Sequence, residues 1–373
     1  MKKKLLIALI TITVVTVTAL TSLFILGRKT NVNTNKNIQG LNEELSEIMY
    51  LGSLAPSSHN IQCWQIELYP EEGKLTVSAD PERKLDVVDP HAREQFLSLG
   101  CYIRTLEEAF LAYGYNVTYS YDESSDTMNF NYKKISDKTD SNTIARIKKR
   151  HTDKRSFDIN DSSKNDYVSK LCKVTGSEYY SFDTKEFAII KKATSDAYIK
   201  QAYDPETAKE LSEWLRLSDK ETKDKKDGLS AEQLGITGIK KVFYYLFTNH
   251  ETAKGKTFAD QGIANTENQL SGCMGFIIVS SGDSKKELVE CGIKTTDIWL
   301  DLTENNISVH PMSYAIEESE YKATLKAQLA GSDTNNEDVS KQEPQMLLRV
   351  GCVKNYGENN AIRRDLQDYI KVH

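Results

Sequence analysis

Apolar and polar positions change their spacing several times along the chain, and the first segment is the most distinctive. No charged residue occurs between Leu5 and Leu26, and three lysines precede this stretch. A helix of this length spans about 33 Å, enough to cross the hydrocarbon core of a bilayer. The pattern predicts a transmembrane anchor over residues 5–27. A cleaved signal peptide is the alternative, although its apolar region usually covers only about 7–15 residues.

Basic residues flank the predicted span on both sides. Lys2–Lys4 precede it, and Arg28, Lys29 and Lys36 follow it. The excess of positive charge that usually marks the cytoplasmic side is therefore almost balanced. Because a short basic N-terminal tail usually stays inside, the pattern favours a soluble domain outside the cytoplasm. Residues 28–40 are polar and predict a linker between the anchor and the folded part.

A spacing typical of amphipathic helices occurs twice in the rest of the chain. Apolar residues advance by three and four positions in turn over residues 96–110, and again over residues 288–302. The two stretches match position by position at an offset of 192 residues, and Gly100 and Gly292 match at the same offset. Any two amphipathic helices share their spacing, so coincidence is the competing explanation.

The residues that follow the two helices also match. Gly114 ends the first helix, and Asn306, which also tolerates a left-handed backbone, stands at the corresponding place after the second. Val117 and Val309 then occupy matching positions in the short strands expected next. These matches favour an internal duplication over coincidence.

We therefore expect an α+β fold of two fused halves, residues 41–137 and 138–373, that pack as a pseudo-dimer. The second half contains a dense run of charges at residues 218–235. Such a run is either a solvated loop or helix end, or a mobile lid over a site. Residues 332–343 predict another polar loop, ahead of an apolar strand at Met346–Val350.

Composition excludes several classes of function. The formal net charge is −6, which argues against nucleic-acid binding because that function needs a basic surface. None of the six cysteines has C-x-x-C spacing, so we expect buried free thiols rather than a zinc or iron–sulfur site. The sequence also lacks G-x-S-x-G, P-loop, G-x-G-x-x-G and H-E-x-x-H motifs.

Two short segments carry the candidate chemistry. Ala-Pro-Ser-Ser-His-Asn at residues 55–60 is rich in turn formers and offers several donors and acceptors to a planar ligand such as a flavin. Residues 148–155 hold five cations and a threonine hydroxyl, the groups that bind a phosphate monoester. A basic helix end on the surface is the alternative. Arg363 and Arg364 contribute only if the C-terminal tail returns to the phosphate.

Both segments resemble motifs of the FMN-dependent nitroreductases. Residues 149–157 are similar to the opening phosphate-binding motif of that family. Residues 55–64 resemble its A-P-S-S-x-N-x-Q-P-W flavin motif, with Cys63 in place of the usual proline. The order of the motifs, and the Asp-Gly-Leu at residues 227–229, resemble a tandem, Acg-like branch in which two nitroreductase-like halves are fused. The resemblance covers roughly residues 41–370.

The resemblance implies one FMN bound between the halves, because the turn occurs only in the first half and the cation motif only in the second. The turn would line the flavin, the cations would hold the phosphate and ribityl chain, and residues 311–313 would bring backbone N–H groups near flavin N5 and O4. The implied cofactor-binding residues are Pro56, Ser57, Ser58, Asn60, Arg150, His151, Thr152, Lys154, Pro311, Met312, Ser313, Arg363 and Arg364.

The resemblance also implies an oxidoreductase activity centred on the flavin, without a catalytic side chain. NADH or NADPH would supply a hydride, and a nitroaromatic, a quinone or a similar small molecule would accept it in the same pocket. The soluble part would be a monomeric pseudo-dimer. A non-catalytic protein that binds or sequesters flavin in an occluded site is the alternative. An interaction protein that has lost the cofactor is a third.

Overall fold

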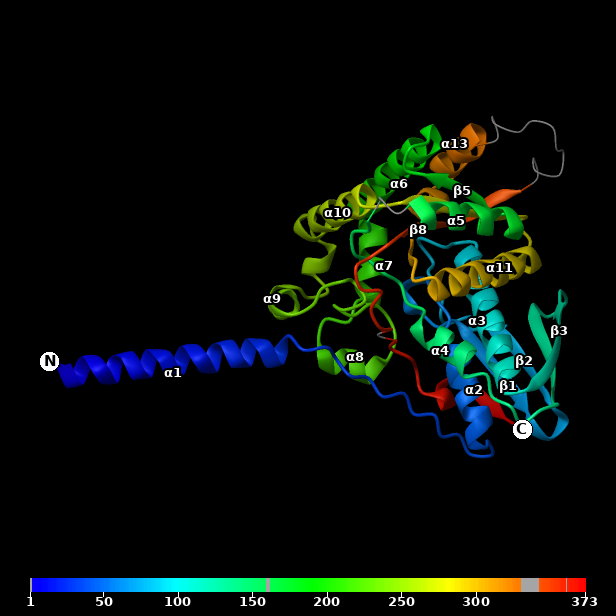
Figure 1. Cartoon of the computed structure of the whole chain (residues 1–373), viewed down its shortest axis with the longest axis horizontal. Coiled ribbons are helices and arrows are strands. Elements are labelled where there is room, and N and C mark those ends of the chain that lie inside the picture. Colours follow the sequence, from blue (N-terminus) through cyan, green and yellow to red (C-terminus); the bar gives the residue numbers. More distant parts are fainter. Residues whose placement is uncertain (1, 159–161, 330–341, 360) are drawn as a thin grey trace.

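The computed structural model describes residues 2–158, 162–329, 342–359 and 361–373. The described residues form an α+β structure that is about 51% helical and has two sheets, of five and four strands (Figure 1). The predicted α+β class is therefore confirmed.

The five-stranded sheet belongs mainly to the first part of the chain. Its elements are α2 (Glu43–Ser53), β1 (Trp64–Tyr69), β2 (Lys74–Ala79), α3 (Arg93–Ala112), β3 (Tyr115–Asp122) and β4 (Thr127–Lys134). The strand order is β3-β4-β2-β1-β9, in which β9 (Ile370–Val372) pairs parallel with β1 and the other neighbours are antiparallel. The C-terminus thus returns to the first part of the chain. Gly73, in the β1–β2 turn, has a φ of 63° that suits glycine.

The four-stranded sheet repeats this topology. Its elements are α5 (Ser162–Thr175), β5 (Glu178–Ser181), β6 (Gly275–Ser281), α11 (Lys285–Glu304), β7 (Ser308–Pro311) and β8 (Glu343–Gly351). The strand order is β5-β6-β8-β7, with antiparallel neighbours throughout. The elements of both units therefore follow one another along the chain in the order helix, strand, strand, helix, strand, strand. In both units the second helix leads directly into the third strand.

Additional helices interrupt the second unit. Between β5 and β6 lie α6 (Lys185–Tyr203), α7 (Pro205–Trp214), α8 (Asp219–Lys225), α9 (Ile239–Phe247), η3 (Thr252–Lys254) and α10 (Lys256–Ser271). Between β7 and β8 lie α12 (Tyr314–Glu317) and α13 (Ser319–Leu329), and α4 (Ser141–Lys149) joins the two units. The charged run at 218–235 begins with α8, whose N-terminus is capped by Ser218. Residues 332–341 of the expected polar loop lie outside the described part.

Helices α3 and α11 form the most extensive helix–helix contact in the fold, and they cross at the matched glycines. A Cβ atom on Gly100 would lie 2.0 Å from the Val289 carbonyl oxygen, and one on Gly292 would lie 2.1 Å from that of Leu97. Only glycine permits so close an approach of the two backbones. Asn306 also has the expected left-handed backbone, with a φ of 56°.

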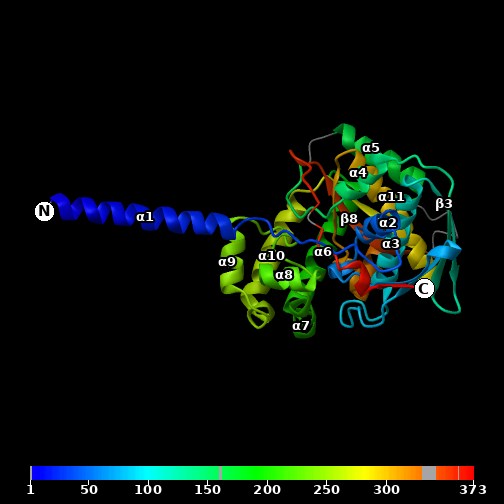
Figure 2. The same ribbon diagram turned by 90° about the horizontal axis from the view of Figure 1, so that it is seen from below.

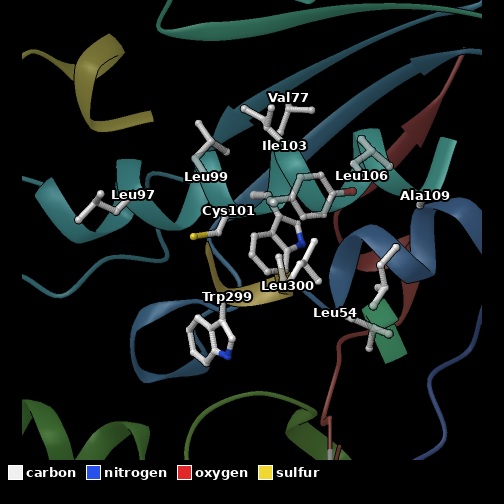
Figure 3. Packing of buried hydrophobic residues seen from close by; sticks show 14 of the residues in the cluster. Leu54, Val77, Leu97, Leu99, Cys101, Ile103, Leu106, Ala109, Trp299 and Leu300 are labelled. Carbon is white, nitrogen blue, oxygen red and sulfur yellow. The ribbon is translucent and has the colours of Figure 1, made fainter. Parts of the chain in front are cut away.

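The main core lies between this helix pair and the two sheets. In Figure 3, Leu99, Cys101 and Ile103 of α3 lie above Leu300 of α11, and Trp299 lies below them. Trp64, the first residue of β1, is fully buried and stacks on Tyr102 at 4.6 Å between ring centroids. This core holds the end of α2 and the start of α3 in fixed positions, and the candidate site lies beside them.

Helix α1 (Lys2–Leu26) projects away from the folded body in both views (Figures 1 and 2). Its segment Leu9–Leu26 is exposed and is long and apolar enough to cross a membrane. A membrane anchor and a signal sequence both have these properties. The linker after it is extended but lies against the body: the Thr34 hydroxyl donates to the Arg363 carbonyl at 2.9 Å, and the Leu366 N–H donates to that of Asn35 at 3.0 Å.

Candidate functional site

A cavity of about 380 Å³ lies where the turn at residues 55–60 meets the cation segment at residues 150–154. Its volume is within the range of small-molecule sites. The structure therefore brings together two segments that are about 90 residues apart in the chain. Of the thirteen residues implied by the sequence, these line the cavity: Pro56, Ser57, Ser58, Asn60, Arg150, His151, Thr152, Lys154, Pro311, Ser313 and Arg363.

The turn is held in an unusual backbone conformation. His59 and Asn60 have φ angles of 46° and 54°, within the left-handed region that non-glycine residues rarely adopt. The Gln62 N–H donates to the Ser57 hydroxyl at 3.1 Å, and the Ser58 hydroxyl donates to the Glu94 carboxylate. Such strain persists only where the surroundings enforce it, and it is common at ligand sites.

Asn60 ties three segments together at the edge of the cavity. Its amide Nδ2 donates to the carbonyls of Gly228 at 3.1 Å and Ile362 at 3.3 Å, and its Oδ1 accepts from Arg363 at 3.1 Å. The side chain is buried and its polar groups are in use. Asn60 therefore shapes the cavity by joining the turn, the charged run and the C-terminal segment.

Arg150 is a buried cation at the wall of the cavity. Its Nη2 donates to the Leu54 carbonyl at 2.7 Å, and its guanidinium lies 4.7 Å from the centroid of the Trp299 ring. Its Nη1 is buried and has no hydrogen-bond partner among the described residues. Burial lowers the pKa of Arg150 to about 10. The guanidinium stays charged at neutral pH and keeps one donor free.

Arg363 lies beside Arg150, and both cap the end of α2. Arg363 donates to the carbonyls of Ser53, Leu54 and Ala55, so both guanidiniums share the Leu54 oxygen. Burial, and then the neighbouring charge of Arg150, lowers the pKa of Arg363 to about 9. The negative end of the helix dipole stabilises these cations partly. Neither forms an ion pair with a carboxylate in the part of the chain that the structure describes.

Lys154 and Arg155 have opposite surroundings although they are neighbours. Lys154 lines the cavity, forms no ion pair with any described carboxylate, and has its pKa lowered to about 8 by burial. Arg155 instead forms an ion pair with Asp153 at 2.6 Å and donates to the carbonyls of Asn355 and Tyr356 at 2.9 Å. Lys154 therefore adds to the positive charge of the cavity, whereas the charge of Arg155 is balanced.

His151 and Thr152 complete the segment. The His151 Nδ1 lies 2.9 Å from the Lys149 carbonyl oxygen, and burial lowers the pKa of His151, so its ring is neutral at pH 7. Thr152 forms an isolated parallel bridge with Val309, which attaches this segment to the end of β7. The second unit therefore positions the cations opposite the turn of the first.

Two of the implied residues do not line the cavity. Met312 is fully buried in a separate hydrophobic cluster, and its N–H donates to the Leu347 carbonyl at 2.9 Å, so that N–H is unavailable to a ligand. Arg364 donates to the carbonyls of Gln62 at 3.1 Å and Asp368 at 2.7 Å.

Two carboxylates in the cavity wall were not predicted from the sequence. Glu94, at the start of α3, accepts from the Ser58 hydroxyl and from Arg93 at 2.7 Å. Glu317, at the end of α12, accepts from the Gln201 amide at 2.9 Å. Glu94 could not be recognised in the sequence as a site residue, because acidic residues are common in the first turn of any helix. Glu317 is one of several acidic residues in a polar stretch.

These two carboxyl groups have opposite pKa shifts. Burial raises the pKa of Glu317 well above its usual value, and the charge of Glu94 raises it further. Burial also acts to raise the pKa of Glu94, but the Arg93 guanidinium and the Ser58 hydroxyl outweigh it and lower that pKa. The pKa of Glu94 is therefore lowered and that of Glu317 raised, and neighbouring carboxyl groups with opposite pKa shifts are typical of functional sites.

The helices inserted between β5 and β6 cover one side of the cavity. Leu229, Leu234 and Phe258 contribute apolar wall. The charged run is fastened there by ion pairs of Asp227 with Arg83 and Arg216, and of Lys226 with Asp365 at 2.6 Å. Leu229, Glu232, Gln233 and Leu234 of this run line the cavity.

Comparisons with known proteins assign this chain to no family. A scan against models of protein families finds no match, and a search of curated proteins finds no similar sequence. An account of what the cavity binds therefore rests on its residues.

Proposed function

We propose that this chain is an FMN-dependent oxidoreductase of the nitroreductase type, with one flavin in the cavity between its two units. The observation that carries the proposal is the pair of buried guanidiniums, Arg150 and Arg363, which have no carboxylate partner among the described residues. Lys154 adds a third cation on the same cavity.

An anionic ligand fits this arrangement better than a neutral one. Burying a charge without a counter-charge is unfavourable by several kcal/mol. The phosphate of FMN carries up to two negative charges and offers three acceptor oxygens. The free Nη1 of Arg150 and the Lys154 ammonium are donors of the kind that such a group binds. The strained turn and the Trp299 ring supply the less polar remainder of the wall.

The repeated topology supports the pseudo-dimer. Both units have the same order of helices and strands along the chain, and the two longest helices of the body cross at glycines that match in the sequence. Two fused copies of one unit would give this arrangement. The second unit takes the place of a second subunit, so we propose that the soluble part acts as a monomer.

FMN, when bound, would supply the transfer of reducing equivalents from NADH or NADPH to a nitroaromatic, a quinone or a similar acceptor. The side chains of this protein would bind the cofactor, exclude water and provide a proton. Reduction of such acceptors consumes protons together with electrons. Glu317 lies in the cavity wall and holds a proton more strongly than an ordinary glutamate, because burial and then the adjacent Glu94 charge raise its pKa. Glu317 is therefore the candidate proton donor.

Replacing Glu317 with glutamine tests this role. Gln keeps the size of the side chain but removes the acidic proton, so we expect acceptor reduction to slow by about 100-fold, in the range of lost general acid catalysis. FMN affinity should change little. Steady-state turnover with saturating FMN measures the effect, and Glu320→Gln, at an exposed position on α13, is the matched control. Equal turnover in both variants would remove Glu317 from the mechanism.

Lys154 should make FMN affinity dependent on pH. Its pKa of about 8 means that the charged form, which attracts phosphate, predominates below pH 8 and is lost above it. Bound phosphate favours the charged form, so affinity should be highest near pH 7 and up to about tenfold weaker at pH 9. Fluorescence titration at each pH measures this. The Lys154→Arg variant should bind FMN with the same affinity at both pH values. If affinity falls equally in that variant, a group other than Lys154 causes the pH dependence.

Flavin sequestration is a second candidate function, favoured by the ion pairs that fasten the charged run beside the cavity. Anaerobic addition of NADH or NADPH to the full-length, FMN-loaded protein in detergent separates the two. An enzyme should lose its yellow colour within seconds and regain it with an acceptor. A protein that stays yellow with both donors would be a flavin-binding protein without this activity.

We also propose that α1 remains attached and anchors the chain in a membrane, with the folded body outside the cytoplasm. Its apolar surface is exposed along the segment Leu9–Leu26. The residues after it are hydrogen-bonded to the body through Thr30 and Thr34.

A further inference from the structure

Helix α9 has the reverse of the polarity expected for a surface helix in water. Its exposed residues are Lys240 and the apolar Ile239, Phe243, Leu246 and Phe247, of which the last two are 67% and 74% exposed. The two phenylalanine rings stack on each other at 6.2 Å between centroids. On the opposite face Lys241 is fully buried. Water favours neither the exposed aromatic rings nor the buried ammonium.

Lys241 is buried because it fastens the end of α1. Its ammonium forms ion pairs with Glu232 at 2.6 Å and Asp219 at 2.7 Å, and it donates to the Arg28 carbonyl at 2.8 Å and the Thr30 hydroxyl at 2.7 Å. The Thr30 hydroxyl also donates to Asp219. The residues just after the apolar helix are therefore fixed to a residue in the first turn of α9.

The backbones of the two helices also meet. A Cβ atom on Gly27 would lie 2.7 Å from the carbonyl carbon of Gly238, the residue that precedes α9. In Figures 1 and 2, α9 is the part of the folded body closest to α1, and it runs across the direction of α1. A helix that crosses a bilayer upright would thus place α9 in the plane of the membrane, at the level where the apolar span ends.

We propose that α9 lies in the interface of the membrane that α1 crosses, with its apolar face among the upper acyl chains. The proposal rests on the proposed anchoring by α1. An amphipathic helix whose axis lies in the membrane plane buries its apolar face in this region. Arg28, Lys29 and Lys240 lie at the same end of the body and are exposed, where they meet anionic headgroups.

This contact would also fix one wall of the cavity. Glu232, which forms the ion pair with Lys241, lines the cavity together with Gln233 and Leu234. The inserted segment thus connects the bilayer surface to the site through the buried ion pair of Lys241 with Glu232. The two functions are separable experimentally because α9 itself contributes no residue to the cavity wall.

Depth-dependent fluorescence quenching tests the proposal in the full-length chain. Phe247→Trp places a reporter on α9, and Phe182→Trp, at a position just after β5 that is 43% exposed, is the matched control. Each variant is inserted into phosphatidylcholine–phosphatidylglycerol vesicles, with or without lipids brominated near the upper end of the acyl chains. After subtraction of the parent signal, we expect quenching of the α9 reporter to be at least threefold that of the control reporter.

Each other outcome overturns the proposal and indicates a different cause. Equal quenching of the two reporters in a chain that floats with the vesicles would show that α1 anchors but α9 stays in water. Failure to float would remove the anchor as well. A blue-shifted, unquenched α9 reporter together with a dimeric mass in detergent would assign the apolar face to a second copy of the chain. None of these results alters FMN binding, which is measured separately by titration.

Discussion

Replacing Arg150 with alanine should weaken FMN binding by about 10- to 100-fold, the effect of losing one or two charged hydrogen bonds. Arg150 lines the cavity, has no carboxylate partner among the described residues, and has an Nη1 that makes no hydrogen bond among them. The Leu54 carbonyl, its present acceptor, retains Arg363 as a donor. The fold should therefore survive the substitution. Quenching of FMN fluorescence on binding measures the dissociation constant directly.

Arg155→Ala is the matched control, because it removes the same kind of side chain five positions away. The charge of Arg155 is balanced by its ion pair with Asp153, and its side chain donates to the Tyr356 carbonyl. Its loss should lower stability slightly and change FMN affinity by less than about threefold, since an ion pair that is half-exposed contributes little. Equal losses of affinity in the two variants would show that neither cation binds the phosphate specifically.

Replacing Gly100 with alanine should destabilise the protein by about 3 kcal/mol or more. The added methyl group would lie 2.0 Å from the Val289 carbonyl oxygen, a distance that no rotamer change can relieve because the methyl carbon is attached directly to one backbone and the oxygen belongs to the other. Helices α3 and α11 must then move apart, which opens the main core at its centre. A denaturant titration followed by circular dichroism measures the loss, and Gly292→Ala should behave in the same way.

Glu290→Ala is the control for this effect. Glu290 lies on α11 two residues before Gly292 but is exposed, so its replacement should change stability by less than about 0.5 kcal/mol. Similar stabilities of Gly100→Ala and Glu290→Ala would contradict the close crossing of the helices and, with it, one support of the pseudo-dimer.

The regular elements could be predicted well because local pattern determines them. The spacing of residues 96–110 and 288–302 gave both central helices, and the strands at Val117, Val309 and Met346–Val350 are present. These elements place apolar residues at helical or alternating spacing, and tertiary contacts did not override them.

The candidate site was predicted only in part, since chemistry in a cavity depends on contacts between distant segments. The turn and the cations could be recognised because each is contiguous in the sequence. Glu94 and Glu317 lie in distant parts of the sequence, and only their proximity in the fold gives them opposite pKa shifts. Met312 and Arg364 were misplaced because the side-chain alternation of an irregular segment is not visible in its sequence.

Equilibrium binding of FMN to the full-length protein in detergent tests the central claim most directly. Calorimetric titration at pH 7, with riboflavin as the ligand that lacks phosphate, gives both stoichiometry and the contribution of the phosphate group. The account predicts one FMN per chain, bound at least tenfold more tightly than riboflavin. No binding, two FMN per chain, or equal affinities for the two ligands would contradict a single flavin site that holds its phosphate on Arg150, Lys154 and Arg363.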